Sequence, residues 1–127
     1  MKTGIVIFAH GSSVASANDA VREVAQTTAR EAQFELFETA FLEGGRPDLR
    51  EAVDSLVRNG ASRILVIPYF LTLGLHLQRD LPAIVRNISS IHAGVDIRVT
   101  PPLDGHPALA RILEDRAREA LASDSRN

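Results

Sequence analysis

The stretch GIVIFAHGSS, residues 4–13, decides the fold. Its apolar part, Ile5–Ala9, contains no interrupting charge, which is typical of a β-strand buried on both faces. Histidine, glycine and two serines follow at once, and such small polar residues suit a loop. The stretch therefore predicts a central strand of a parallel sheet, with His10 at its carboxyl end.

Three more segments have strand character. Arg63–Ile67 is apolar without interruption after its first residue, whereas Phe34–Phe41 and Val95–Val99 are interrupted by charged residues. The two uninterrupted strands should lie in the centre of the sheet and the two mixed strands at its edges. Short right-handed connections between neighbouring strands then favour the order 2-1-3-4.

Segments with apolar residues at helical spacing follow each predicted strand. We expect Asn18 and Asp80 to cap the first and third helices, and Pro47 and Pro107 to begin the second and fourth. The fourth helix is expected to turn inward the apolar residues Leu109, Ile112, Leu113, Ala117, Ala120 and Leu121. The alternation predicts an α/β fold, a single four-stranded parallel sheet with helices on both faces.

Length and composition limit the number of domains, the kinds of partner and the chemistry that the chain can have. The 127 residues suit one domain, which we place at residues 1–122, followed by a frayed tail at 123–127. The formal net charge of −2 argues against nucleic acid as a partner. The absence of cysteine excludes disulfides and thiolate chemistry. The apolar run near the N-terminus, of about six residues, is too short for a membrane span or a signal-peptide core, so we expect a cytoplasmic protein.

Candidate functional residues gather in the loops expected at the carboxyl ends of the strands, where open α/β sheets bind ligands. Strands 1 and 3 should be neighbours, so His10 and His76 should face one pocket. The loops also carry Ser12, Ser13, Glu43, Arg46, Gly74, Arg79 and His106, with Gly74 expected to let its loop turn. The alternatives are a strand-end His10 bonded to backbone, a core His76, and a solvated Glu43–Arg46 ion pair.

These loop residues are compatible with two kinds of chemistry. Two histidines and a carboxylate suit a loosely held divalent metal ion, and they suit proton abstraction equally well. The glycine-rich motifs for dinucleotides and for nucleoside triphosphates are absent, and so is the serine elbow of α/β hydrolases.

Four blocks of sequence, which together span nearly the whole chain, match a known family. They are His10-Gly11-Ser12; Phe41-Leu42-Glu43 with Pro47 and Leu49; Pro68–Leu71 with Gly74-x-His76-x-x-x-Asp80-x-Pro82; and Pro102-Leu103-x-Gly105-x-Pro107. In these blocks the chain resembles the small class II sirohydrochlorin chelatases, and the third block is the most specific.

The resemblance implies that the chain inserts a divalent ion (Co²⁺, Fe²⁺ or Ni²⁺) into the tetrapyrrole sirohydrochlorin without a nucleotide. It implies His10 and His76 as metal-binding and catalytic residues, with Glu43 as a further catalytic residue, in a homodimer. Candidate substrate-binding residues are Ser12, Ser13, Arg46, Gly74 and Arg79. Ser13 stands where the family often has arginine, so a contact to substrate would be lost or moved to Arg46 or Arg79.

Two other classes of function remain open. One is a binding module that holds a tetrapyrrole or a metal without turnover. The other is a phosphotransfer enzyme with His10 as nucleophile, although such enzymes usually carry arginine where this chain has Ala9. The leucines at 71, 73, 75 and 77 either contact a flat macrocycle or belong to the core.

Overall fold

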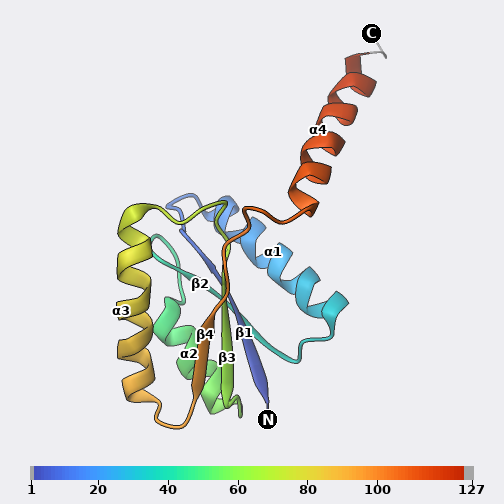
Figure 1. The fold of residues 1–127 in the computed structure, drawn as a ribbon. Coiled ribbons are helices and arrows are strands. Elements are labelled where there is room, and N and C mark those ends of the chain that lie inside the picture. Colours follow the sequence, from blue (N-terminus) through green and yellow to red (C-terminus); the bar gives the residue numbers. More distant parts are fainter. Residues whose placement is uncertain (1, 125–127) are drawn as a thin grey trace.

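The computed structural model of the chain describes residues 2–124 (Figure 1). Strands and helices alternate along these residues, as the sequence predicts. The strands are β1 (Thr3–Ala9), β2 (Leu36–Phe41), β3 (Arg63–Pro68) and β4 (Asp96–Val99). The helices are α1 (Ala15–Ala32), α2 (Leu49–Arg58), α3 (Leu75–Ile91) and α4 (Ala108–Asp124).

The sheet confirms the predicted topology. Its order is β2-β1-β3-β4, and every neighbouring pair is parallel. Strand β1 is hydrogen-bonded on both edges, with Ile5 opposite Phe37 of β2 and opposite Leu65 of β3. The two apolar strands are central, β1 with both faces buried and β3 with one face buried and the other partly buried, and the strands that carry charges lie at the edges.

Alternating side chains of β1 pack into two separate hydrophobic clusters, one on each face of the sheet. Val6 and Phe8 pack in the larger cluster, together with buried residues of α2 and α3 such as Val53 and Leu81. Ile5 and Ile7 point the other way and pack with Ala25, Val21, Phe37, Leu65 and Ile67. Figure 1 shows the same division, with α2 and α3 on one side of the sheet and α1 on the other.

Two helices begin earlier than the sequence predicts. Helix α1 starts at Ala15, so Asn18 is a buried residue within it and not its N-cap. Helix α3 starts at Leu75 after Gly74, because the Gln78 N–H already bonds the Gly74 carbonyl and completes a turn before Asp80. Pro82 therefore lies inside α3. Burial of Leu77 and Leu81 offsets the backbone hydrogen bond that proline cannot make.

The expected inward face of α4 is wrong. None of the residues of α4, all of which the structure describes, is buried, and Leu113 and Leu121 are 71% and 67% exposed. Figure 1 shows the reason: the helix projects from the carboxyl end of the sheet and does not lie against it. A pattern of apolar residues indicates which face of a helix will be buried, but it does not indicate which surface will cover that face.

The end of the chain differs in part from the predicted tail. Helix α4 continues through Ser123 and Asp124, two residues beyond the predicted domain end. The remaining residues of the predicted tail, 125–127, lie outside the described part of the chain. Along residues 2–124, no helix combines the length and apolar character needed to cross a membrane.

Helix α2 begins with a complete capping box. The Asp48 side chain accepts from the Glu51 N–H (2.8 Å), and the Glu51 carboxylate accepts from the Asp48 N–H (3.0 Å). Arg46 adds a 2.6 Å ion pair to Glu51. The backbone bond from Asp48 is the main cause that lowers the pKa of Glu51 below 4.5, and the charge of Arg46 adds to it.

A lowered pKa means that Glu51 stabilises the fold above its ordinary titration range, and that this gain is lost as the pH falls through the lowered pKa. We expect Arg46→Gln to raise the pKa of Glu51 while leaving it below 4.5, because the stronger Asp48 bond remains. Carboxyl ¹³C NMR titration measures this directly. Arg50→Gln, which removes the arginine paired with Asp54 in the same helix, is the control and should leave the pKa of Glu51 unchanged. A Glu51 midpoint at 4.5 in the unaltered protein would contradict the prediction.

Candidate functional site

The loops at the carboxyl edge continue the hydrogen bonding of the sheet. The Leu42 and Glu43 N–H groups bond the carbonyls of Ala9 and His10, and the Tyr69 N–H bonds that of Phe8. The loop after β4 is attached in the same way, since the Leu103 N–H bonds the Phe70 carbonyl. The loops that carry the predicted site residues are therefore held in register with the strands beneath them.

His10 and Glu43 are brought together at this edge. His10 Nε2 lies 3.7 Å from Glu43 Oε1, and both side chains are mostly exposed. The other ring nitrogen, Nδ1, lies 3.2 Å from the Gly11 carbonyl oxygen. A carbonyl can only accept, so in the neutral ring Nδ1 carries the proton and Nε2 keeps a lone pair. In this tautomer Nε2 has a lone pair 3.7 Å from a carboxylate oxygen, a separation that suits a cation bound by both atoms.

Gly11 makes this approach possible. Its φ is +88°, and a Cβ there would lie 1.7 Å from the carbonyl oxygen of Glu43. Any larger residue would push the two loops apart, and with them His10 from Glu43. The glycine after the histidine is thus required by the backbone, which is the physical reason for its place in the motif.

Asn18 fixes the two loops to each other. Its side-chain oxygen accepts from the Ser12 N–H (3.0 Å), and its amide nitrogen donates to the carbonyls of Ser12 (2.9 Å) and Gly44 (3.0 Å). The residue is 6% exposed. Sequence reasoning missed this role, because asparagine near a helix start is an equally good signal for an N-cap.

His76 lies on the first turn of α3 and not in the preceding loop, and it is exposed, so it is not a core histidine. Arg79 Nη2 lies 3.2 Å from His76 Nδ1. A guanidinium can only donate, so Nδ1 is the acceptor and the neutral ring carries its proton on Nε2. The two histidines therefore present different atoms: a lone pair on His10 Nε2 and an N–H on His76.

Phe70 connects the two halves of the edge. It follows β3, and its ring meets the His10 ring edge-on, with centroids 6.4 Å apart. Among residues 2–124, no three histidine, aspartate or glutamate side chains gather closely enough to hold a metal ion. The structure thus joins His10 with Glu43 and His76 with Arg79 as two separate pairs.

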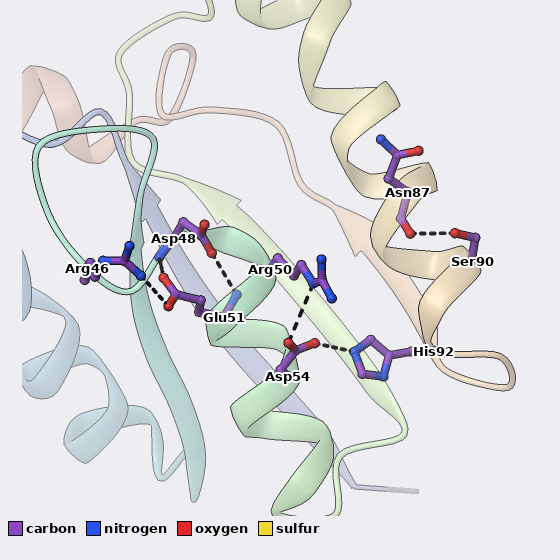
Figure 2. A network of polar contacts seen from close by, with 8 residues as sticks. All are labelled: Arg46, Asp48, Arg50, Glu51, Asp54, Asn87, Ser90 and His92. Atoms are coloured by element: carbon purple, nitrogen blue, oxygen red, sulfur yellow. Dashed lines mark hydrogen bonds and ion pairs between the residues drawn. The ribbon is translucent and has the colours of Figure 1, made fainter.

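The remaining predicted residues differ in whether their side chains are already bonded to other groups of the protein. Ser13 is exposed, whereas the Ser12 hydroxyl accepts from the Val14 N–H in the turn before α1. Arg46 is paired with Glu51 (Figure 2), whereas Glu43 lies beside His10. His106, at the start of α4, accepts from the Ala108 N–H through Nδ1. Glu43 and Arg46 are thus not the solvated ion pair that the sequence left open.

Gly74 does not have the role expected of it. Its φ of −65° is open to any residue, so the turn needs no glycine there. A Cβ at this position would meet nothing within 4 Å. Of the leucines at 71, 73, 75 and 77, Leu77 is buried and Leu73 is partly buried, whereas Leu71 and Leu75 are 66% and 83% exposed. The residues just before His76 are therefore the exposed Leu75 and Gly74 with its open space, and the exposed Leu71 lies earlier in the loop.

A second polar cluster lies away from this edge (Figure 2). His92 follows the end of α3, and its Nε2 bonds Asp54 of α2 at 2.5 Å, with Arg50 3.8 Å from the same carboxylate. Both partners of the short bond are mostly buried. The cluster joins the end of α3 to α2, which is a structural role for the histidine to which the sequence gave no function.

The family follows from a comparison with known proteins. A family model described as CbiX matches residues 4–120, which is most of the chain. The chain belongs to the CbiX family. This confirms the resemblance found in the sequence blocks.

Relatives of this CbiX-family chain include chelatases for two metals. It is 31% identical to a sirohydrochlorin cobaltochelatase of Sulfurisphaera tokodaii, over 98% of both chains. It is 29% identical to the chloroplastic sirohydrochlorin ferrochelatase of Arabidopsis thaliana, over 94% of this chain and 53% of that protein. A solved structure of a CbiX protein from Marinobacter aquaeolei VT8 matches at 30% identity with a TM-score of 0.84, over 95% of this chain and 98% of that one.

The buried Asn18 amide gives a test of how the site is held in this CbiX-family chain. We expect Asn18→Ala to lower the free energy of unfolding by about 1–3 kcal/mol, because the groups that it bonds on Ser12 and Gly44 lose their partner. Urea unfolding followed by circular dichroism measures the change.

Asn59→Ala is the matched control. Asn59 is exposed and bonds only the Ser55 carbonyl of its own helix end through its side chain. Loss of this hydrogen bond should lower the free energy of unfolding by well under half as much as Asn18→Ala does. Equal stability of Asn18→Ala and the unaltered protein would contradict the structural role of Asn18.

Proposed function

We propose that this protein inserts a divalent metal ion into sirohydrochlorin without a nucleotide. Co²⁺ and Fe²⁺ are the first candidates, since chelatases for both are among its relatives, and Ni²⁺ is the third. The observation that carries the proposal is the His10–Glu43 pair, with its lone pair and carboxylate oxygen 3.7 Å apart. Two ligand atoms that share one metal ion at about 2.1 Å each lie about 3–4 Å apart.

In this proposal the metal ion is a substrate that the protein holds and releases. His10 Nε2 and a Glu43 oxygen bind it at the rim, where water reaches both side chains. Two protein ligands leave most of the coordination sphere open, so the ion can pass to the pyrrole nitrogens. A fully closed site would retain it.

His76 is the second metal-binding and catalytic residue of the proposal. Insertion releases two pyrrole protons: water at the exposed rim takes one, and His76 can take the other only through a ring nitrogen that has a free lone pair. Arg79 occupies Nδ1. Arg79 is 74% exposed, so it can turn to a substrate carboxylate and leave Nδ1 free to accept a proton. Substrate binding would thereby prepare the base.

The substrate surface is proposed to combine polar and apolar parts. Arg79, Ser12 and Ser13 offer polar contacts to substrate carboxylates, while Arg46 would first have to leave Glu51. Exposed Leu71 and Leu75 offer apolar contact to a flat ring, and Gly74 leaves room for it.

We also propose that the protein is a homodimer, as the family resemblance implies. The exposed apolar residues of α4 support this, because large apolar surfaces usually mark interfaces. The cytoplasm stays the expected location.

Absorbance on mixing protein, sirohydrochlorin and Co²⁺ or Fe²⁺ tests the function. His10→Ala and His76→Ala should each slow metal insertion by about a hundredfold, because each removes a ligand or a base. His106→Asn is the control, since its amide oxygen can still accept from the Ala108 N–H, and its rate should be normal.

The experiment can fail in two distinct ways. Variants that metallate at the normal rate above the spontaneous background would overturn the assigned residues. Stoichiometric binding of the tetrapyrrole without any rate enhancement would show a binding module and not an enzyme.

Gly74 provides a test of the substrate surface. Gly74→Leu should fold normally, because its backbone is unstrained and the space is open, but it should raise the KM for sirohydrochlorin about tenfold or more by blocking the ring. Gly74→Ser is the control, since serine is small and is a preferred N-cap. An unchanged KM in Gly74→Leu would place the macrocycle elsewhere.

A further inference from the structure

The polar contacts of His10 do not by themselves fix the plane of its ring. The side chain is 61% exposed. Nδ1 lies 3.2 Å from the carbonyl oxygen of Gly11, and Nε2 lies 3.7 Å from a Glu43 oxygen. The first distance is at the long end of the range for a hydrogen bond, and the second is beyond it. Because the outer torsion of histidine is broad, a ring held only in this way would turn Nε2 away from Glu43.

The register of the sheet places an aromatic ring beside His10. Phe8 of β1 lies opposite Pro68 of β3, and the Tyr69 N–H extends this ladder by bonding the Phe8 carbonyl. Two residues beyond Phe8 and Pro68, the same ladder brings His10 next to Phe70. The two rings meet there edge-on, with centroids 6.4 Å apart and an angle of 74° between their planes. His10 and Phe70 are thus cross-strand neighbours.

The Phe70 ring is itself anchored in the protein. It is partly buried and packs against the larger core cluster. Its centroid lies 6.0 Å from that of the Phe8 ring, which is buried. The Phe70 carbonyl also accepts from the Leu103 N–H of the loop after β4. Core packing and a backbone hydrogen bond therefore hold the ring that His10 meets.

An edge-on contact between two rings depends on their orientation. The face of an aromatic ring carries partial negative charge and its edge partial positive charge, so two rings attract each other when an edge meets a face. A leucine in place of Phe70 would fill similar space but would have no such preference. The aromatic contact therefore restrains the His10 ring with Nδ1 near the Gly11 carbonyl and Nε2 near Glu43.

We propose that Phe70 is a positioning residue for His10, whose ring it holds so that Nε2 and the Glu43 carboxylate can bind one metal ion. The inference rests on the proposed function, in which these two groups hold the metal ion before its insertion. A phenyl ring offers no ligand atom, so Phe70 acts on a bound ion only through the orientation of His10. The predicted effect can therefore be measured with the metal ion alone, without the tetrapyrrole.

Titration of the full chain with Co²⁺, followed by calorimetry, tests the positioning role. Phe70→Leu should weaken Co²⁺ binding about tenfold, because groups that orient a metal-binding histidine usually have effects of this size. Phe70→Tyr keeps the ring and should bind Co²⁺ nearly as tightly as the unaltered protein. Phe37→Leu is the matched control, since Phe37 is also partly buried but packs on the opposite face of the sheet. It should leave the affinity for Co²⁺ unchanged.

The tautomer of His10 gives a second measurement that does not depend on a metal ion. In alkaline buffer, where histidine is neutral, ¹⁵N NMR shows which ring nitrogen carries the proton. The unaltered protein and Phe37→Leu should hold the proton on Nδ1, which donates to the Gly11 carbonyl. Phe70→Leu should give a mixture of both tautomers, because the released ring can turn. An unchanged His10 spectrum in Phe70→Leu would contradict the positioning role.

The same measurements separate failure of the inference from failure of the proposed function. If His10→Ala loses Co²⁺ but Phe70→Leu keeps both its affinity and its tautomer, only the positioning role is overturned. Equal weakening in Phe37→Leu and Phe70→Leu would also overturn it, because any loosened core would then have the same effect. If His10→Ala binds Co²⁺ as tightly as the unaltered protein, the metal-binding role of His10 in the proposed function is overturned, and the positioning role falls with it.

Discussion

The hydrogen bonding of β1 on both of its edges is the constraint on which the rest of the structure depends. Because Ile5–Phe8 are apolar on both faces, the strand is stable only inside a sheet that has helices on each side. This central position makes the loop after β1 a neighbour of the loops after β2 and β3. The register of the ladder thus sets which side chains can meet at the carboxyl edge.

Polar contacts then fix the loops relative to one another. Backbone bonds continue the ladder past the strand ends, and the Asn18 amide joins the loops that carry Ser12 and Gly44. Gly11 then permits the close approach of His10 to Glu43, which a Cβ would prevent. The fold supplies the order of the loops, and a few buried polar groups supply their spacing.

Helix α4 does not satisfy the rule that apolar faces are buried within a domain. Its leucines Leu113 and Leu121 stay exposed, and Leu65 and Ile67 on the α1 side of the sheet are only partly buried. The bonded connection of residues 100–107 separates them.

The sequence by itself determined the four strands, their order and the edge at which His10, Glu43 and His76 lie, because apolar periodicity and strand order follow from local residue pattern. It also determined the family, through short blocks of residues. Only the tertiary structure decided that Asn18 joins two loops, that Arg79 bonds His76, and that α4 leaves its own sheet. The first outcome depends on a contact with Gly44, which is distant in the sequence. The second depends on the start of α3 at Leu75, which puts His76 and Arg79 three residues apart on one helix, and the third on the path of a connection. Local periodicity does not fix any of these.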